Sequence, residues 1–163
     1  MKRFFALFAA LTLLCTRISA QTTACRTETN IAYRNAADDG YVDSLCRLDI
    51  CYPVDRKGFP TVVWFHGGGL TDGRREIPKA LCDKGFAVVG VDYRLAPRVK
   101  VADCVADAAA AAAWVVKNIA SYGGDPRLIF IAGHSAGGYL TSMIGLDKRW
   151  MAPYGIDPDT AFA

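Results

Sequence analysis

The residues best suited to chemistry lie in the run Gly133-His134-Ser135-Ala136-Gly137. Small residues flank the serine, as a sharp strand-to-helix turn requires where two stretches of backbone approach closely. The run follows the apolar segment 128–132 and precedes the helix-forming segment 139–146. At such a turn the hydroxyl would project above a sheet, next to a helix N-terminus that favours developing negative charge. We therefore predict that Ser135 is a nucleophile; the alternative is an incidental glycine-rich turn.

A second motif, His66-Gly67-Gly68-Gly69, favours the same chemistry. Nucleophilic attack on a carbonyl creates an oxyanion, which needs N–H donors that already point at it. Glycines allow the backbone to turn its amides inward without obstruction by side chains. Gly68 and Gly69, or Gly67 and Gly68, would supply two donors, and Ala136 a third. A phosphate-binding loop is disfavoured because no lysine follows the glycines and a histidine precedes them.

Three apolar runs of strand length are expected to position these motifs. Each run is followed directly by polar or glycine residues that belong to a motif; the runs are residues 61–65, 87–91 and 128–132. The stretches between them, 74–84 and 101–122, are predicted to be helices. Strands that are apolar throughout must be covered on both faces. The pattern therefore predicts an α/β fold with a doubly wound, mostly parallel sheet, in which ligands bind beyond the carboxyl ends of the strands. The alanine-rich stretch 101–122 is predicted to be a close-packed structural helix.

The segment before residue 61 is expected to add two more strands. Residues 47–52 alternate between apolar and polar side chains, the period-two pattern of a half-exposed strand, and residues 31–34 are predicted to be a strand as well. Asp38-Asp39-Gly40 between them indicates a turn.

These motifs together resemble the hormone-sensitive-lipase-like branch of the α/β-hydrolase esterases. The resemblance covers residues 31–163 and is carried by the glycine loop, the serine run extended to Gly138, and two further motifs: Asp92-Tyr93-Arg94-Leu95-Ala96-Pro97 and Gly124-Asp125-Pro126. It implies that residues 31–163 form the N-terminal part of an α/β-hydrolase domain. It also implies hydrolysis of carboxylic esters through an acyl-enzyme on Ser135, without a cofactor or metal. His66, Asp92, Arg94 and Asp125 would brace the loops around the site.

A narrower resemblance concerns the substrate. Residues 94–100 and 138–145 look most like secreted bacterial esterases that act on plant-polysaccharide decorations, such as acetylxylan and feruloyl esterases. The expected partner is therefore a small-molecule or polysaccharide-linked ester.

A general base for Ser135 is missing from the sequence. In this fold the acid and the histidine of the triad follow the serine. The chain has two histidines, His66 and His134, and neither follows Ser135. Three aspartates do follow, but too soon to end a later strand: Asp147, Asp157 and Asp159. We expect the hydrolase domain to be incomplete and the chain by itself to be nearly inactive. An amidase or formamidase, and a non-catalytic relic or binding module, stay open as alternatives.

The N-terminus has the features of a secretory signal peptide. Lys2 and Arg3 precede an apolar stretch that is too short to span a bilayer, and residues 18–20 offer a cleavage site. We therefore expect export to the periplasm or the medium, without stable insertion in a membrane. Residues 21–30 are polar and are predicted to form a flexible lead-in.

Composition and cysteine content narrow the classes further. The 163 residues are 52% hydrophobic, which is typical of one globular domain. Beyond residue 20 the numbers of acidic and basic side chains are equal, so nucleic acid is not an expected partner. Of the six cysteines, Cys46 and Cys51 should point to opposite faces of one strand, and Cys82 with Cys104 is a weakly indicated disulfide. Most are expected to be small buried hydrophobes.

Overall fold

The protein forms a five-stranded mixed sheet with helices, described here by a computed structural model that places residues 24–35 and 39–163. The sheet order is β1-β2-β4-β3-β5. The strands are β1 (Cys25–Ala32), β2 (Arg47–Pro53), β3 (Phe59–Phe65), β4 (Ala87–Val91) and β5 (Gly124–Gly133). The helices are α1 (Gly40–Leu45), α2 (Val101–Tyr122), α3 (Ala136–Leu146) and α4 (Pro158–Ala161), with short 3-10 turns at Lys79–Leu81, Lys148–Trp150 and Ala152–Tyr154. The predicted α/β class is confirmed.

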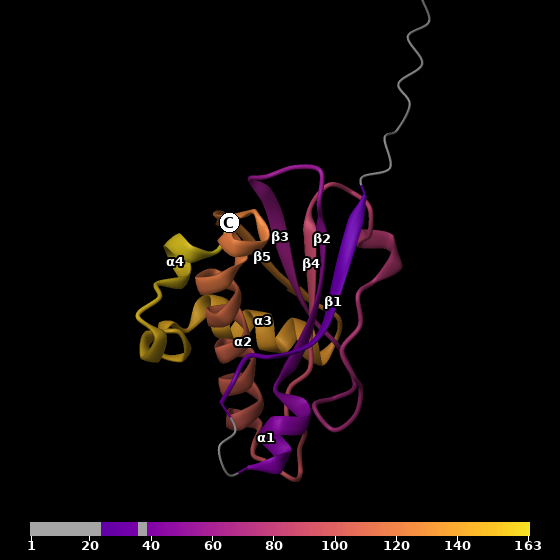
Figure 1. Cartoon of the computed structure of the whole chain (residues 1–163). Coiled ribbons are helices and arrows are strands. Elements are labelled where there is room, and N and C mark those ends of the chain that lie inside the picture. The colour runs from indigo at the N-terminus through magenta and orange to yellow at the C-terminus, as the bar shows by residue number, and fades with distance from the viewer. Residues whose placement is uncertain (1–23, 36–38) are drawn as a thin grey trace, which may run out of the picture.

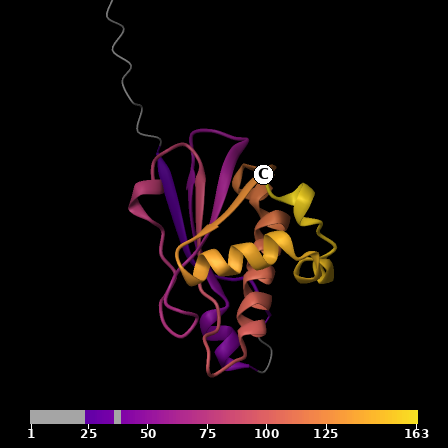
Figure 2. The ribbon, with the colours of Figure 1, turned by 180° about the vertical axis from the view of Figure 1, so that it is seen from behind.

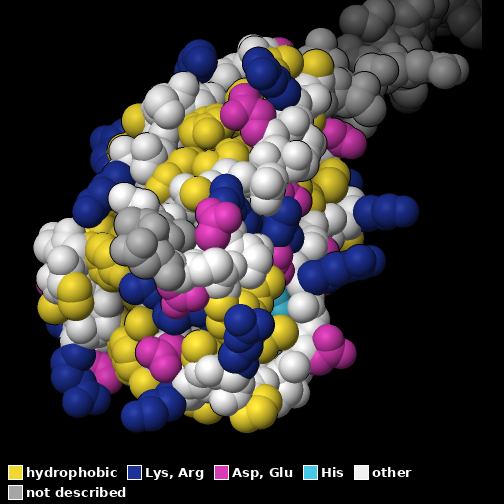
Figure 3. Space-filling view, turned by 60° about the horizontal axis from the view of Figure 1, so that its bottom comes forward, with side chains coloured by type: hydrophobic (Ala, Val, Ile, Leu, Met, Phe, Trp, Pro, Cys, Tyr) yellow, Lys and Arg dark blue, Asp and Glu magenta, His cyan; other side chains and the backbone are white. Residues whose placement is uncertain are grey.

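Strand direction divides the sheet into two parts. β3 runs parallel to both β4 and β5, whereas β2 is antiparallel to β1 and to β4. The parallel part is therefore the part that the three apolar runs predicted. Its carboxyl ends lie together at the bottom of Figure 1, and Figure 3 turns that end toward the viewer, where acidic and basic side chains alternate around small apolar patches.

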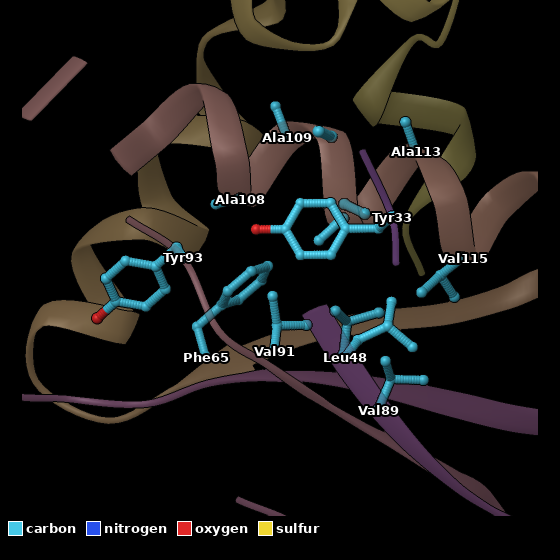
Figure 4. Packing of buried hydrophobic residues seen from close by; sticks show 14 of the residues in the cluster. Tyr33, Leu48, Phe65, Val89, Val91, Tyr93, Ala108, Ala109, Ala113 and Val115 are labelled. Atoms are coloured by element: carbon cyan, nitrogen blue, oxygen red, sulfur yellow. The ribbon is translucent and has the colours of Figure 1, made fainter. Parts of the chain in front are cut away.

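Helices α2 and α3 lie on one side of the sheet (Figures 1 and 2). The apolar side chains of this face, among them Phe65, Val89 and Val91, are fully buried. They meet the alanines of α2, including Ala108, Ala109 and Ala113 (Figure 4). Because an alanine side chain is only a methyl group, the helix can pack close to the strands, as expected for this stretch.

The opposite face of β4 is covered by a loop rather than by a helix. Residues 66–86 run along the sheet next to β1 (Figure 1), and a Cβ at Gly90 would lie 2.3 Å from the carbonyl oxygen of Glu76. The helix predicted over residues 74–84 is therefore wrong: only the turn Lys79–Leu81 is helical. Pro78 lacks the N–H that a helix over residues 74–84 would need at this position, and the amide of Arg75 is bound by the carboxylate of Asp92.

Two expectations about the N-terminal segment also change. Residues 25–30, expected to be part of a flexible lead-in, belong to β1 and pair with β2. The turn expected around Asp39 opens a helix, because the Asp39 carboxylate caps α1 by accepting from the amide of Tyr41 (2.9 Å). The expected signal peptide, residues 1–20, lies outside the described residues. Within residues 24–35 and 39–163, no helix is long and apolar enough to cross a membrane.

Candidate active site

Ser135 occupies a sharp turn between β5 and α3. Its backbone has φ +52° and ψ −112°, a conformation that a residue with a side chain rarely adopts, and its side chain is exposed. The amide of His134 donates to Phe65 O (3.2 Å), and the amide of Gly137 donates to His134 O (2.8 Å). The first hydrogen bond holds the turn against the end of β3, and the second closes the turn itself.

Two glycines make this turn possible. A Cβ at Gly137 would lie 2.0 Å from the carbonyl oxygen of Phe65, and one at Gly133 would lie 2.5 Å from the carbonyl carbon of Gly137. Gly138 is different, since its Cβ would be 3.7 Å from the nearest atom, an ordinary contact. Gly133 and Gly137 are therefore required by the approach of α3 to β3, and Gly138 is not.

The glycine loop after β3 folds back on itself. Gly68 has φ +109° and Gly69 has φ +61°, so both occupy the left-handed region that favours glycine. The amides of Thr71 and Asp72 both donate to Gly68 O (3.0 Å each) and close the turn. Among the backbone hydrogen bonds of the described residues, none is donated by the amides of Gly67, Gly68 or Gly69. The loop thus keeps unpaired N–H groups at this end of the sheet.

The loop and the serine turn are in direct contact at Gly67. A Cβ there would lie 2.9 Å from Nδ1 of His134 and 3.4 Å from Cβ of Ser135. Any side chain at position 67 would therefore press on the serine turn. The structure brings together the two motifs that lie about seventy residues apart in the chain.

His66 is buried and turned into the protein. Its Nδ1 lies 2.7 Å from Gly67 O, an arrangement that requires the proton on Nδ1, and its ring stacks on that of Tyr93 with centroids 4.4 Å apart. The Tyr93 hydroxyl donates to His66 O (2.9 Å). Nε2 lies 3.6 Å from Oδ1 of Asp92 and has no hydrogen-bond partner among the residues that the structure places. Both ring nitrogens are thus turned toward groups other than Ser135.

Asp92 ties the loop 66–86 to the sheet. Its Oδ2 accepts from Nη1 of Arg75 (2.5 Å), and Nε of Arg75 also donates to Asp49 on β2 (2.9 Å). Burial alone would lower the pKa of Arg75, but its hydrogen bonds to the two aspartates raise it, so the guanidinium stays charged. The backbone oxygen of Asp92 accepts from the hydroxyl of Tyr33 (2.7 Å). Asp92 therefore links the end of β4 to the loop 66–86 through Arg75 and to the segment after β1 through Tyr33.

Arg94 and Asp125, the other two residues expected to brace loops, each belong to a local ion pair. Arg94 forms a bidentate pair with Asp107 of α2, with Nε–Oδ2 at 2.7 Å and Nη2–Oδ1 at 2.9 Å. Asp125, at the start of β5, accepts from the amide and the side chain of Arg127 on the surface. Arg94 thus joins the segment after β4 to α2, and Asp125 braces the entry to the strand that leads to Ser135.

An open hollow of about 320 Å³ lies beside the two motifs. Its walls come from the glycine loop, the residues that follow it, and His134; Ser135 is the next residue in the chain but is not part of the lining. The lining residues are His66, Gly67, Gly68, Asp72, Gly73, Arg74, Glu76 and His134. Within the part of the chain that the structure describes, no group of three or more His, Cys, Asp or Glu side chains could hold a metal ion.

Sequence reasoning missed two residues that shape the site. Gly73 has φ +109°, and a Cβ there would lie 2.4 Å from Nδ1 of His66. Asp107 of α2 is fully buried and pairs with Arg34 as well as with Arg94. A lone carboxylate in a run of buried alanines was the available signal, because a buried charge must be paired.

The fold and this turn define the class of the protein. A serine at a strand-to-helix elbow, over parallel strands and beside a glycine loop, is the arrangement of the α/β-hydrolases. Three comparisons agree. The sequence is 38% identical over 122 residues to the carboxylesterase NlhH of Mycobacterium tuberculosis, covering 72% of this chain and 38% of that protein. The structure of esterase B from Lactobacillus rhamnosis has a TM-score of 0.68 at 29% identity, covering 82% of this chain and 44% of that one.

A truncated form of a carbohydrate esterase from gut microbiota is similar too, with a TM-score of 0.60 at 27% identity over 78% of this chain and 45% of that one. The model of the BD-FAE family matches residues 48–153, and the chain belongs to this family. The resemblance to hormone-sensitive-lipase-like esterases is thereby confirmed. The chain spans 24–38% of the length of the first curated relatives that it matches.

Proposed function

We propose that this chain carries the nucleophile and the oxyanion site of a serine carboxylic ester hydrolase. Ser135 attacks the ester carbonyl and forms the acyl-enzyme. The amide of Ala136 and two amides of the glycine loop, from Gly67, Gly68 and Gly69, stabilise the oxyanion. The observation that carries the proposal is the strained backbone of an exposed Ser135, at φ +52°, with the glycine loop in contact beside it.

The loop amides support this role because, among the described residues, none of them donates a backbone hydrogen bond. An N–H group that is not hydrogen-bonded within the protein is free to bind an oxygen that becomes negative during the reaction. Loss of one such donor typically lowers turnover by a factor of about 10²–10³. The N-terminus of α3 adds a favourable dipole at the same place.

The base that would activate Ser135 is not supplied by the two histidines of the chain. His66 faces Gly67 O and Asp92, and no hydrogen bond joins His134 to Ser135 in the described part of the chain. We therefore propose that the 163 residues alone retain only the slow reaction that oxyanion stabilisation and binding allow.

We propose an ester on a plant polysaccharide, or a small ester of the same kind, as the substrate. Support comes from the similarity to a carbohydrate esterase and from the resemblance of residues 94–100 and 138–145 to esterases that act on plant-polysaccharide decorations. Export through residues 1–20 fits such a substrate, because a polymer must be met outside the cell.

A fluorophosphonate probe tests the nucleophile. We expect slow labelling of the 163-residue chain at a single serine and none in the Ser135→Ala variant. Ser142→Ala is the matched control, because Ser142 is exposed on the same helix, where its hydroxyl only donates to Gly138 O (2.9 Å). Labelling that survives in Ser135→Ala, or is lost in Ser142→Ala, would overturn the assignment. Rapid stoichiometric labelling of Ser135 would instead show that a base lies within these residues.

A further inference from the structure

Tyr93 is a buried tyrosine beside the glycine loop, and the reaction proposed above gives it no role. It lies in the segment after β4 and is only 1% exposed. Its ring lies at the edge of the apolar cluster, with the hydroxyl pointing away from the cluster (Figure 4). Because a buried hydroxyl needs a hydrogen-bond partner, the contacts of Tyr93 indicate why a polar ring occupies this position.

Tyr93 holds His66 at two points. Its hydroxyl donates to His66 O (2.9 Å), and its ring stacks on the imidazole with the two ring planes 9° apart. Burial raises the pKa of Tyr93, so the hydroxyl keeps the proton that it donates. Both the backbone carbonyl and the side chain of His66 are therefore fixed by one neighbour.

The side chain of His66 in turn holds the next carbonyl of the loop. Its Nδ1 donates to Gly67 O (2.7 Å). Gly73 closes over this hydrogen bond, since a Cβ at position 73 would lie 2.5 Å from Gly67 O. His66 is also only 4% exposed, so little water competes for the bond. Tyr93 thus controls two consecutive carbonyls, one directly and one through the imidazole.

The direction of each carbonyl decides the direction of the amide that follows it. A peptide group is planar and trans, so its C=O and its N–H point in opposite directions. His66 O is turned toward Tyr93, and the amide of Gly67 therefore points away from Tyr93. Gly67 O is turned toward the imidazole, which directs the amide of Gly68 away from the imidazole. The amide of Gly69 is directed differently, by the turn within the loop that holds Gly68 O.

We propose that Tyr93 is a positioning residue of the oxyanion site, which aims the amides of Gly67 and Gly68 through His66. The inference rests on the function proposed above, in which two of the three loop amides stabilise the oxyanion. Any two of the three include Gly67 or Gly68, so Tyr93 controls at least one donor in every case. No hydrogen bond joins Tyr93 to Ser135 among the described residues, so Tyr93 acts on the reaction only through the direction of these amides.

This role predicts an effect on the rate of reaction and not on binding. An oxyanion exists only once Ser135 has attacked, so a misdirected amide weakens the transition state and leaves the affinity of the unreacted compound unchanged. Misplacement of a group at an active site by about 1 Å can cost about 10²-fold in rate, and loss of a whole oxyanion donor costs about 10²–10³-fold. Tyr93→Phe removes the hydroxyl but keeps the stacked ring, so we expect a loss of about 10-fold to 10²-fold.

Fluorophosphonate labelling of the Tyr93→Phe chain tests the proposal. When Ser135 Oγ bonds to phosphorus, fluoride leaves and the hydroxyl proton passes to solvent, negative charge develops on the phosphoryl oxygen, which takes the place of the oxyanion. Mass spectrometry of the modified chain over a series of probe concentrations gives the saturating rate and the half-saturating concentration. We expect the saturating rate to fall about 10-fold to 10²-fold and the half-saturating concentration to stay at the wild-type value.

Tyr52→Phe is the matched control. Tyr52 is also a buried tyrosine, and its hydroxyl donates to Oε1 of Glu28 (2.8 Å). It follows Cys51, which is opposite Val88 near the start of β4, so it lies at the other end of the sheet from Ser135. Tyr52→Phe should keep the wild-type saturating rate, and urea denaturation checks that both variants are folded under the labelling conditions.

NMR relaxation of the Gly68 amide provides a measurement that needs no reaction. Its order parameter should be near the value of rigid backbone, about 0.85, in the wild-type chain and in Tyr52→Phe, and lower in Tyr93→Phe. An order parameter that Tyr93→Phe leaves unchanged would overturn the role of Tyr93.

The labelling results separate this role from the proposed function. A wild-type chain in which Ser135 is not labelled would overturn the proposed function and the role of Tyr93 with it. A wild-type chain that is labelled, with an equal saturating rate in Tyr93→Phe, would overturn the role of Tyr93 alone. The same conclusion would follow if Tyr52→Phe shared the fall in rate, or if the half-saturating concentration rose in step with it.

Discussion

Replacing Gly137 by alanine tests the reason why the serine turn needs glycine. The added Cβ would lie 2.0 Å from Phe65 O and 2.7 Å from Phe65 C, and neither is the end of a flexible side chain. Either β3 or the start of α3 must move. Overpacking of this kind costs about 1–3 kcal/mol or more. The gain in helix propensity from glycine to alanine is at most about 1 kcal/mol, so we expect a net loss of stability.

Gly138→Ala is the matched control, one residue further along the same helix. Its Cβ would meet only an ordinary contact at 3.7 Å, so the propensity gain should remain. Because the propensity gain is common to both variants, they should differ in free energy of unfolding by the overpacking cost alone, about 1–3 kcal/mol or more. Urea denaturation followed by tryptophan fluorescence measures this difference. Equal stabilities, or a larger loss in Gly138→Ala, would show that close backbone contact does not explain the glycine at 137.

Three further changes test other parts of the structure. Asp107→Ala removes the buried partner of Arg94 and should lower the free energy of unfolding by about 3–5 kcal/mol in urea denaturation; a loss below 1 kcal/mol would contradict the buried pair. The hydrogen bonds from Arg127 lower the pKa of Asp125 to about 2, so the small stabilisation from this exposed pair should be present above about pH 4 and fade as the pH falls toward 2. An NMR titration in which Arg127→Ala left that pKa unchanged would refute the stated cause. Phe130→Lys replaces a side chain that is 40% exposed on β5 and should raise solubility without changing the circular dichroism spectrum.

The elements that the sequence predicted well are those with a strong local pattern. β4 and α2 have the predicted bounds, because an unbroken apolar run and an alanine-rich run each favour a single structure. The loop 66–86 was mispredicted because its conformation depends on distant groups. Asp49 and Asp92 bind Arg75, and the backbone of Glu76 lies against Gly90. These contacts produce no periodic hydrophobic pattern within the loop, so the sequence of the loop does not reveal its conformation.

The residues of the candidate site also fall into two groups: those predicted by a local motif and those that depend on distant contacts. Ser135 and the glycine loop could be found because each motif answers a chemical need within a few residues. Gly73 could not, since its requirement comes from the ring of His66, which only the folded loop brings near. The alanine-rich run around Asp107 indicates that its carboxylate is buried and paired. The sequence does not show which partners it has, because Arg34 and Arg94 lie in other segments of the chain.

The strained backbone of Ser135 is held by contacts that the described residues make among themselves. A non-glycine residue held at positive φ costs about 1–3 kcal/mol, which the surrounding structure must offset. Hydrogen bonds from His134 and Gly137 hold the turn, and α3 is anchored behind it by the fully buried Leu140 and Ile144. All of these contacts are made within the 163 residues. These contacts hold Ser135 and the glycine loop in place, and in the function proposed above they would position the nucleophile while leaving its activation to a separate base.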